Sequence, residues 1–381
     1  MPKAHEQASR RSGPRILVVG AGIAGLAVAR SLRSHGFDLD VVERQPTWSP
    51  AGAGIYLPGN AARALRSLGL EDAVIERAAR ITRQRFTDHR GREFFEVDVA
   101  ALWHDVGPCL ALHRADLHTV LATDGGLVDV SLGTAVREID QQGGTATVEF
   151  DDGSLGRYDL IIGADGIHST IRARCFDSPA AQPVGRVAWR FVAGCPADLT
   201  AWTVMFGRDV TFLTIPIGGG RAYCYIDSPG LSPAATQPVE ELHRMLADFA
   251  EPVPSLLEAL GPDGPVHVAV VEEISRTDWF RGAVLLVGDA AHAAAPNMAQ
   301  GAAMAFEDAV LLAECLTSAP DVGRAVAAFQ QRRRPRTEWV LQQTRRRDRM
   351  RGLTPQLRDR LMRVGGPRIF RANYRPLLDP P

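Results

Sequence analysis

Apolar and polar residues along the first 45 positions follow a pattern that predicts a strand, a helix and a second strand. The run RILVVG at 15–20 is short, apolar and β-branched, and it ends in glycine. The alanine- and leucine-rich segment up to residue 35 has helical spacing, and DLDVVER at 38–44 returns to strand character. A strand, a glycine turn, a helix and a strand in this order open a parallel, doubly wound domain.

The middle of the chain predicts antiparallel strands. Alternation at 83–98 predicts a hairpin that turns at DHRGRE, and residues 134–159 predict a second meander that turns at QQGG and DDGS. After about residue 179, valine, threonine and aromatic residues predict a mostly antiparallel sheet from four segments, 185–194, 202–218, 221–227 and 266–274. A helical segment at 239–260 interrupts this sheet.

Later segments return to the pattern of the first domain. YDLIIGAD at 158–165 and GAVLLVGD at 282–289 predict buried strands, and helices are expected at 300–316 and 322–348. We therefore expect a mixed α/β (α+β) fold, in which a discontinuous Rossmann-type domain carries an inserted, mostly antiparallel sheet domain and C-terminal helices. The expected boundaries are a flexible tail at 1–13, the Rossmann-type domain at 14–178 and 276–350, the sheet domain at 179–275 and a C-terminal segment at 351–381.

Composition narrows the classes of partner. The formal net charge of the 381 residues is -1, which gives no reason to expect nucleic acid or stable membrane association. Arginine clusters at 332–334 and 345–347 are interpreted as solvated helix faces. Five cysteines without paired spacing suggest neither disulfides nor a zinc site, and the polar N-terminus does not resemble a signal peptide, so a reducing cytoplasm is expected.

The first turn carries a dinucleotide-binding pattern. Gly20, Gly22 and Gly25 follow a strand directly and open a helix, where they allow a tight turn, close approach of a pyrophosphate and close helix packing. Glu43 lies at the end of the next strand, where a carboxylate can accept hydrogen bonds from a ribose diol. The expected contact set at this turn is Gly20, Gly22, Ile23, Ala24, Gly25, Glu43 and Arg44. These residues alone do not decide between NAD and FAD.

Two later segments add a resemblance. LIIGADGIHSTIR at 160–172 and VLLVGDAAHAAAPNMAQGAAMAFEDAVLLAECL at 284–316, taken with the glycine turn, resemble the flavoprotein aromatic hydroxylases, the class A flavin monooxygenases typified by para-hydroxybenzoate hydroxylase and salicylate hydroxylase. AGAGIYLPGNAARALRSLG at 51–69 and LHRADLHTVL at 112–121 stand where the family has further flavin-contact segments. The resemblance extends over nearly the whole chain.

The resemblance implies roles for individual residues toward FAD. Gly54 and Arg114 would belong to the further flavin-contact segments, although Arg114 could instead pair with Asp116. Asp165 and Gly166 would lie near the pyrophosphate and serve the encounter with nicotinamide, although an aspartate here can equally cap a helix. NADH or NADPH is expected as a transient co-substrate, because the chain has no second G-x-G-x-x-G.

The segment at 284–316 would hold the flavin ring. Gly288 and Asp289 would bind the ribityl chain, while Gly301 and Ala302 open a helix whose dipole stabilises negative charge on the flavin. Pro296 would lie beside the reactive ring face and is the first candidate catalytic residue. Relatives often have glycine where this chain has Ala299, and His292 is interpreted as bracing the loop.

The second sheet is expected to hold the substrate. Arg190 is the second candidate catalytic residue, as an anchor for a phenolate, carboxylate or carbonyl, with a solvated strand residue as the alternative. Because side chains alternate along a strand, Trp189 and Arg190 must face opposite sides. The candidate substrate contacts are Arg190, Met205, Phe212, Thr214 and Tyr223.

The resemblance implies a monooxygenase that uses NAD(P)H, FAD and O2 to hydroxylate or epoxidise an aromatic, polycyclic or otherwise electron-rich small molecule through a flavin hydroperoxide. The protein would supply placement, electrostatics and exclusion of water, with no metal. A monomer or a homodimer is expected. The alternatives are a flavin-dependent reductase or dehydrogenase that transfers no oxygen, an FAD-binding protein without activity, and an NAD-dependent dehydrogenase.

Overall fold

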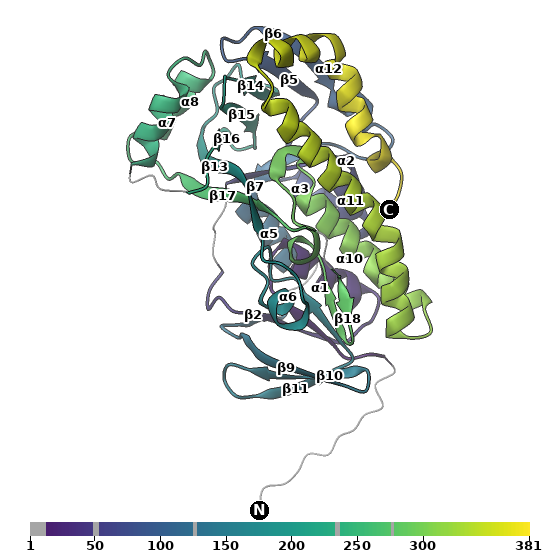
Figure 1. The fold of residues 1–381 in the computed structure, drawn as a ribbon. Coiled ribbons are helices and arrows are strands. Elements are labelled where there is room, and N and C mark those ends of the chain that lie inside the picture. Colours follow the sequence, from purple (N-terminus) through teal and green to yellow (C-terminus); the bar gives the residue numbers. More distant parts are fainter. Residues whose placement is uncertain (1–12, 49–52, 125–127, 233–236, 276–277) are drawn as a thin grey trace, which may run out of the picture.

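The computed structural model describes residues 13–48, 53–124, 128–232, 237–275 and 278–381. The predicted tail therefore lies outside the described residues except for Gly13. Figure 1 shows a doubly wound part and a second sheet, with the long helix α11 running beside both. No helix among the described residues is long and apolar enough to cross a membrane.

The first sheet is a doubly wound, mostly parallel sheet. Its order is β18-β19-β12-β1-β2-β8, and all neighbours are parallel except β18 and β19. The strands are β1 (Ile16–Val19), β2 (Leu39–Glu43), β8 (Ser131–Leu132), β12 (Leu160–Gly163), β18 (Phe280–Arg281) and β19 (Val284–Leu286). Every side chain of β1 and β12 is buried, as expected for strands covered on both faces.

Helices and two small sheets complete this part of the molecule. The helices are α1 (Ile23–Ser34), α2 (Gly59–Ser67), α3 (Glu71–Ile75), α4 (Val99–Leu102), α5 (Arg114–Thr123), α6 (Thr170–Cys175), α9 (Asp289–His292) and α10 (Gly301–Ser318), with a 3-10 turn η1 (Pro296–Met298). One small sheet has the order β3-β7-β4, from Gly54–Leu57, Leu110–His113 and Ala79–Arg80. The other has the order β11-β10-β9, from Leu155–Tyr158, Thr145–Phe150 and Val136–Gln142, and lies at one end of the molecule (Figure 1).

The second sheet has seven strands in the order β17-β13-β16-β15-β14-β5-β6. Its strands are β5 (Arg83–Asp88), β6 (Glu93–Asp98), β13 (Gln182–Gly194), β14 (Trp202–Phe206), β15 (Thr211–Pro216), β16 (Arg221–Pro229) and β17 (His267–Glu273). Helices α7 (Pro238–Leu246) and α8 (Val253–Leu260) cover one face, where they enclose a separate hydrophobic core with Phe191, Phe212 and Ile226.

The expected domain boundary at residue 178 was wrong for the hairpin at 83–98. Strand β5 pairs in parallel with β14, so the β5–β6 hairpin extends the second sheet and does not belong to the first domain. A parallel pair needs a long crossover connection, and the connection between β5 and β14 spans more than a hundred residues. The local alternation predicted the hairpin correctly but contains no information about this distant partner.

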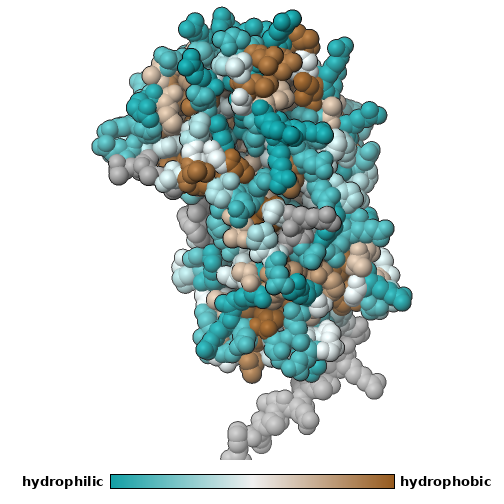
Figure 2. Space-filling model, viewed as in Figure 1, coloured by the Kyte–Doolittle hydropathy of each residue, from teal (hydrophilic) through white to brown (hydrophobic). Residues whose placement is uncertain are grey.

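Two C-terminal helices join the parts. Helix α11 (Val322–Arg351) contains Pro335 and packs against α10, and α12 (Pro355–Leu378) packs against β6. The contact between α12 and β6 is close, because a Cβ atom on Gly366 would come within 2.2 Å of the Phe95 ring. The face drawn in Figure 2 is mostly polar, with hydrophobic patches that include the end carrying α12. The segment at 351–381 is thus one wall of the second domain.

Candidate active site

The three glycines of the first turn serve different purposes. Gly20 has φ +101°, and a Cβ atom there would lie 2.7 Å from the carbonyl oxygen of Ala164. A Cβ atom on Gly25 would lie 1.8 Å from the carbonyl oxygen of Gly20, so the helix could not pack on the strand. A Cβ atom on Gly22, in contrast, would meet no atom within 4 Å. The fold itself requires Gly20 and Gly25, whereas Gly22 leaves open space in front of the helix, where a pyrophosphate would fit.

Glu43 lies at the end of β2 and holds this turn. Its Oε2 accepts a hydrogen bond from the Ala21 amide at 2.9 Å, and its Oε1 accepts one from the Gln45 amide at 2.9 Å. Each carboxylate oxygen can accept a second hydrogen bond, so a ribose diol could still be bound there. Ile23 and Ala24 begin α1, and Arg44 is exposed beside Glu43.

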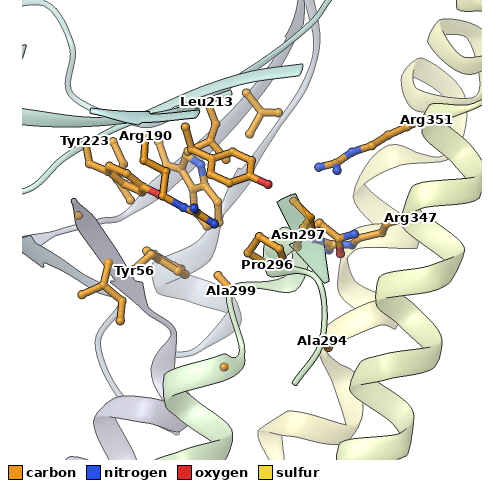
Figure 3. Close-up of a pocket in the computed structure, with 18 of the residues that line it drawn as sticks. Tyr56, Arg190, Leu213, Tyr223, Ala294, Pro296, Asn297, Ala299, Arg347 and Arg351 are labelled. Carbon is orange, nitrogen blue, oxygen red and sulfur yellow. Dashed lines mark hydrogen bonds between the residues drawn. The ribbon is translucent and has the colours of Figure 1, made fainter. Parts of the chain in front are cut away.

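A crevice of about 950 Å³ lies between the doubly wound part and the second sheet. Sequence-predicted residues from several distant segments line it: Gly54, Arg114, Arg190, Tyr223, Asp289, Pro296, Gly301 and Ala302. Figure 3 shows Arg190 and Tyr223 on the sheet side, Pro296 and Ala299 on the opposite side, and Arg347 and Arg351 entering from α11. Gly54 packs against the sheet, because a Cβ atom there would lie 2.3 Å from Cβ of Tyr223.

Asp289 follows the first-sheet strand β19 and opens onto the crevice. Within the described part of the chain, no hydrogen bond to its carboxyl group is formed, and Oδ1 would lie 3.9 Å from a Cβ atom on Gly301. Surrounding protein atoms desolvate this carboxyl group and raise its pKa, while His292 and Arg114 act in the opposite direction. Gly288 has φ +57° and lies so close to α1 that a Cβ atom would be 2.7 Å from Cβ of Ala24. Asp289 is thus positioned to bind hydroxyl groups of a ligand.

The turn before α10 places the helix start at the crevice. Residues 296–298 form η1, Ala299 adopts φ 50°, and α10 begins at Gly301. Ala299 is the only non-glycine residue with positive φ in the described ranges, a conformation that the glycine expected here from the resemblance would adopt more easily. The first amides of α10 have no partner inside the helix and would be available to an anionic group.

Asp165 caps a helix with one of its oxygens. Its Oδ2 accepts hydrogen bonds from the Thr170 amide at 2.7 Å, the Thr170 hydroxyl at 3.0 Å and the Ile171 amide at 3.2 Å. Its Oδ1 is buried and has no partner among the residues described. Gly166 has φ +81°, and a Cβ atom there would meet nothing within 4 Å. The capping role is therefore present, and the second oxygen remains available to a ligand.

Arg114 lies at the start of α5 and lines the crevice. Asp116, the alternative partner considered from the sequence, pairs with Arg221 at 3.3 Å. Near Arg114 on the sheet side, burial lowers the pKa of His267, and both Arg190 and Arg114 lower it further. Two arginines, Arg114 and Arg190, therefore act on this part of the crevice.

A buried ionic network supports the loop that carries Asp289. Oδ2 of Asp308 accepts a hydrogen bond from the Gly288 amide at 2.9 Å and lies 2.7 Å from Nε2 of His292. Arg333 bonds to Asp308 Oδ1 at 2.8 Å and to Glu307 Oε2 at 2.8 Å, and its side chain is 0% exposed. The interpretation of residues 332–334 as a solvated face was therefore wrong for Arg333. The acidic pair at 307–308 within an apolar helix was the sequence feature that could have indicated this network.

Three of the five expected substrate contacts face away from the crevice. Met205, Phe212 and Thr214 are buried on the face covered by α7 and α8, and Thr214 lies next to the thiol of Cys224. Their neighbours on the same strands line the crevice instead: Trp202, Val204, Phe206, Leu213 and Ile215. The predicted contacts are one position away from the residues that line the crevice. Because side chains alternate along a strand, a shift of one residue places each predicted side chain on the opposite face of the sheet. Arg190 and Tyr223 do line the crevice.

Several residues that line the crevice were not predicted from the sequence, because they lie in segments that were expected to belong to other parts of the fold. Tyr56 on β3 and Gln84 and Phe86 on β5 line the crevice, as do Arg351 from α11 and Phe370 from α12. Tyr56 packs on Trp202 with ring centroids 4.3 Å apart. The sequence pattern does not reveal the long-range pairing of β5, which brings residues 84 and 86 beside β14.

Comparisons with known proteins agree with this geometry. The chain matches the family model described as FAD binding domain over residues 14–344. Aurachin C monooxygenase/isomerase of Stigmatella aurantiaca is 31% identical over 327 residues, covering 84% of this chain and 85% of that protein. The 3-amino-4-hydroxybenzoate 2-monooxygenase of Streptomyces cremeus is 33% identical over 347 residues, covering 87% and 86%.

The fold of this chain also agrees with that of a solved structure. The crystal structure of Klebsiella pneumoniae HpxO complexed with FAD and uric acid superposes with a TM-score of 0.81 at 27% identity, covering 96% of this chain and 92% of that chain. The open space at Gly22 and the available oxygens of Asp165 and Asp289 fit FAD as the bound group. The chain belongs to the FAD-binding domain family and is an FAD-dependent monooxygenase of the flavoprotein aromatic hydroxylase type.

Proposed function

We propose that this protein uses NADH or NADPH and O2 to insert one oxygen atom into an aromatic small molecule held between the FAD and the second sheet. The observation that supports this most strongly is the single crevice lined both by the segments that fit FAD and by aromatic side chains of the sheet. Relatives named for aurachin C and for 3-amino-4-hydroxybenzoate support an aromatic substrate. Hydroxylation is favoured, with epoxidation as the related possibility.

Residues of the doubly wound part would contact FAD from its adenosine end to its flavin end. Gly20, Gly22, Ile23, Ala24 and Gly25 would surround the pyrophosphate, with Asp165 and Gly166 beside it. Glu43 and Arg44 would contact the adenosine end, whereas Arg114, Gly288 and Asp289 would contact the flavin end. When bound, FAD supplies the redox chemistry by which NAD(P)H and O2 are used for oxygen transfer.

The start of α10 would stabilise negative charge on the bound flavin ring. Amides at Gly301 and Ala302 would face the pyrimidine edge of the flavin ring, where the helix dipole favours negative charge. Pro296 would restrict the position of the substrate on the reactive face of the ring. The aromatic side chains of the wall would exclude water from the reacting face of the bound flavin.

Arg190 and Tyr223 form the polar part of the sheet wall. Burial raises the pKa of Tyr223 to about 12, with the nearby Arg190 acting in the opposite direction. Tyr223 therefore remains protonated near neutral pH and can donate a hydrogen bond. The guanidinium of Arg190 lies 5.3 Å from the centre of the Tyr225 ring, which fixes its position over the sheet. We assign these residues to binding and orienting a substrate oxygen.

The setting of the enzyme is also part of this proposal. All five cysteines are free thiols, which supports a reducing compartment such as the cytoplasm. We expect a monomer or a homodimer without nucleic-acid or stable membrane partners, since the formal net charge of the sequence is -1. The nicotinamide co-substrate is expected to bind transiently.

The proposal is tested by isotope labelling. The FAD-loaded enzyme is supplied with NADPH or NADH, candidate phenols and heteroaromatic compounds under 18O-labelled O2, and product mass is measured. We expect a product heavier by one labelled oxygen atom and substrate-dependent NAD(P)H oxidation. Product formation without label would instead support a reductase or dehydrogenase, and bound FAD without NAD(P)H oxidation for any compound would support a binding protein.

A further inference from the structure

We propose that Gln84 and Trp202 recognise the polar edge of the substrate, and that this substrate is an uncharged aromatic heterocycle with a ring N–H beside a carbonyl group and an apolar substituent. This inference rests on the proposed function of the crevice. It concerns the class of substrate and two residues that the FAD site does not use.

The two side chains lie opposite each other on paired strands. Gln84 on β5 is the register partner of Trp202 on β14, and the side chains line the crevice with exposed fractions of 3% and 6%. Gln84 Oε1 and Trp202 Nε1 are both buried, and neither has a hydrogen-bond partner in the part of the chain that the structure describes. Buried polar atoms in folded proteins are almost always paired, so an acceptor and a donor left open side by side indicate a ligand.

The position of this pair places it beside the FAD-binding segments. The Trp202 ring packs on Tyr56 of β3. Strand β3 pairs with β7, which leads directly into Arg114 at the start of α5. The polar edge of a substrate bound to Gln84 and Trp202 would therefore lie at the end of the crevice nearest the flavin-contact segments.

The remainder of this wall is mostly apolar, with the Arg358 guanidinium 5.2 Å from the centre of the Phe206 ring. Phe86 and Phe95 stack with ring centroids 4.4 Å apart, and Phe206 continues the same face. Helix α12 closes the wall with Met362, Ile369 and Phe370. Hydrophobic surface extending from the polar pair to α12 would accommodate an alkyl or polycyclic substituent of the heterocycle.

The chemistry of the pair favours an uncharged ligand group. Glutamine and the indole ring carry no charge. The arginines that line the crevice come from other elements: Arg114 from α5, Arg190 from β13, Arg347 and Arg351 from α11, and Arg358 from α12. Two strands, β16 and β15, separate β13 from β14. A carboxylate at the pair would lose its hydration and face two uncharged groups, one of which, Gln84 Oε1, is itself an acceptor, which is costly.

A cyclic amide matches both open positions at once. Its carbonyl oxygen would accept from the Trp202 indole N–H, and its ring N–H would donate to Gln84 Oε1. A phenol hydroxyl can also donate and accept, but both interactions must converge on one oxygen atom, whereas a cyclic amide presents them on adjacent atoms, as the two neighbouring side chains do. The expected ligand group is therefore a lactam-type edge.

Protein stability gives a test that needs no ligand. Replacing Gln84 by methionine removes the unpaired amide oxygen and keeps the side-chain length, so we expect the melting temperature to remain unchanged or to rise. Gln141→Met is the matched control, because Gln141 Oε1 accepts a hydrogen bond from the Ala283 amide at 2.9 Å, and its loss should lower the melting temperature. An equal decrease in both variants would show that Gln84 has a partner and would overturn the inference.

Binding gives the second test, and it does not depend on oxygen transfer. Probes are added to the FAD-loaded enzyme without NAD(P)H, and the change in flavin fluorescence is measured for 3-hexyl-2(1H)-quinolone, its N-methyl derivative and 3-hexylquinoline. The N–H probe should bind wild type about tenfold more tightly than the other two. Gln84→Met and Trp202→Phe should each remove most of this difference.

Equal affinities for the three probes, absence of binding of the N–H probe, or a preference that both variants retain would contradict the inference. Failure here is distinguishable from failure of the proposed function. Labelled oxygen in the product of another aromatic compound would leave the proposed function intact while excluding the lactam-type substrate.

Discussion

Ala299 holds the backbone in a conformation that an alanine adopts only at a cost. Its φ of 50° lies in the left-handed region, which disfavours residues with a Cβ atom by roughly 1–2 kcal/mol. We therefore expect Ala299→Gly to maintain or raise the free energy of unfolding, by up to about 1 kcal/mol, in urea denaturation without FAD. Ala303→Gly, inside helix α10, is the control and should lower it by about 1 kcal/mol. An equal loss in both variants would contradict the backbone argument.

Asp289 offers a test of the FAD site at a single carboxyl group. Because this side chain is exposed to the crevice and accepts no hydrogen bond from the described residues, Asp289→Ala should leave the stability of the FAD-free protein nearly unchanged. FAD affinity, measured by fluorescence titration, should fall by roughly 10- to 100-fold if hydrogen bonds to a charged acceptor are lost. Asp177→Ala, at a carboxylate that is 93% exposed, is the control. Unchanged FAD affinity in Asp289→Ala would remove this residue from the site.

At the scale of elements, one buried carboxylate joins α9, α10 and α11. Burial alone would raise the pKa of Asp308, but His292, Arg333 and the Gly288 amide lower it to about 2. Because the folded-state pKa lies below the ordinary value of 3.8, the carboxylate stabilises the fold fully above about pH 4 and loses this effect as the pH falls toward 2.

The stability difference between wild type and Asp308→Asn should therefore shrink by about 2 kcal/mol between pH 4 and pH 2. It can be measured by denaturation at each pH, with Asp177→Asn as a control that should show no such change. A difference that stays constant over this range would show that Asp308 is not held as a carboxylate by its partners.

The strands of the second sheet allow a test of which face holds the substrate. Phe212 is 0% exposed in the core beneath α7 and α8, whereas the adjacent Leu213 lines the crevice. Phe212→Ala should lower the free energy of unfolding by roughly 3–5 kcal/mol and change the KM for substrate little. Leu213→Ala should raise KM with a smaller loss of stability. The reverse assignment of the two effects would show that the other face of the sheet holds the substrate.

The strands of the second sheet also show which features can be predicted from the sequence and which cannot. Alternation predicted that Phe212 and Leu213 face opposite sides, but the pattern is equally apolar on both, because both faces of the sheet are covered. Which face meets α7 and α8 depends on tertiary packing. The positions of the glycine turn, Asp165, Asp289 and the start of α10 were predictable, because each lies at the end of a strand or the start of a helix that the local pattern predicts; their roles toward FAD stay predictions drawn from the resemblance. Gln84 and Trp202 were not, since their pairing joins strands more than a hundred residues apart.

At the scale of the whole molecule, the crevice exists because two parts of the chain are interleaved. The β5–β6 hairpin leaves the first domain to extend the second sheet, and α12 returns to pack against β6. Helix α11 runs beside both parts in Figure 1, and its Arg333 is fixed by Asp308 in α10. The walls for cofactor and substrate are therefore positioned by one connected set of contacts.

The central claim is that this shared crevice holds the flavin ring on one side and the substrate on the other. A crystal structure of the protein grown with FAD tests it most directly. We expect the pyrophosphate at Gly22, the ribityl chain at Asp289, and the isoalloxazine ring between the start of α10 and the face of the second sheet that carries Tyr223. An isoalloxazine ring bound outside this crevice, or a crevice closed by side chains when FAD is bound, would contradict the account.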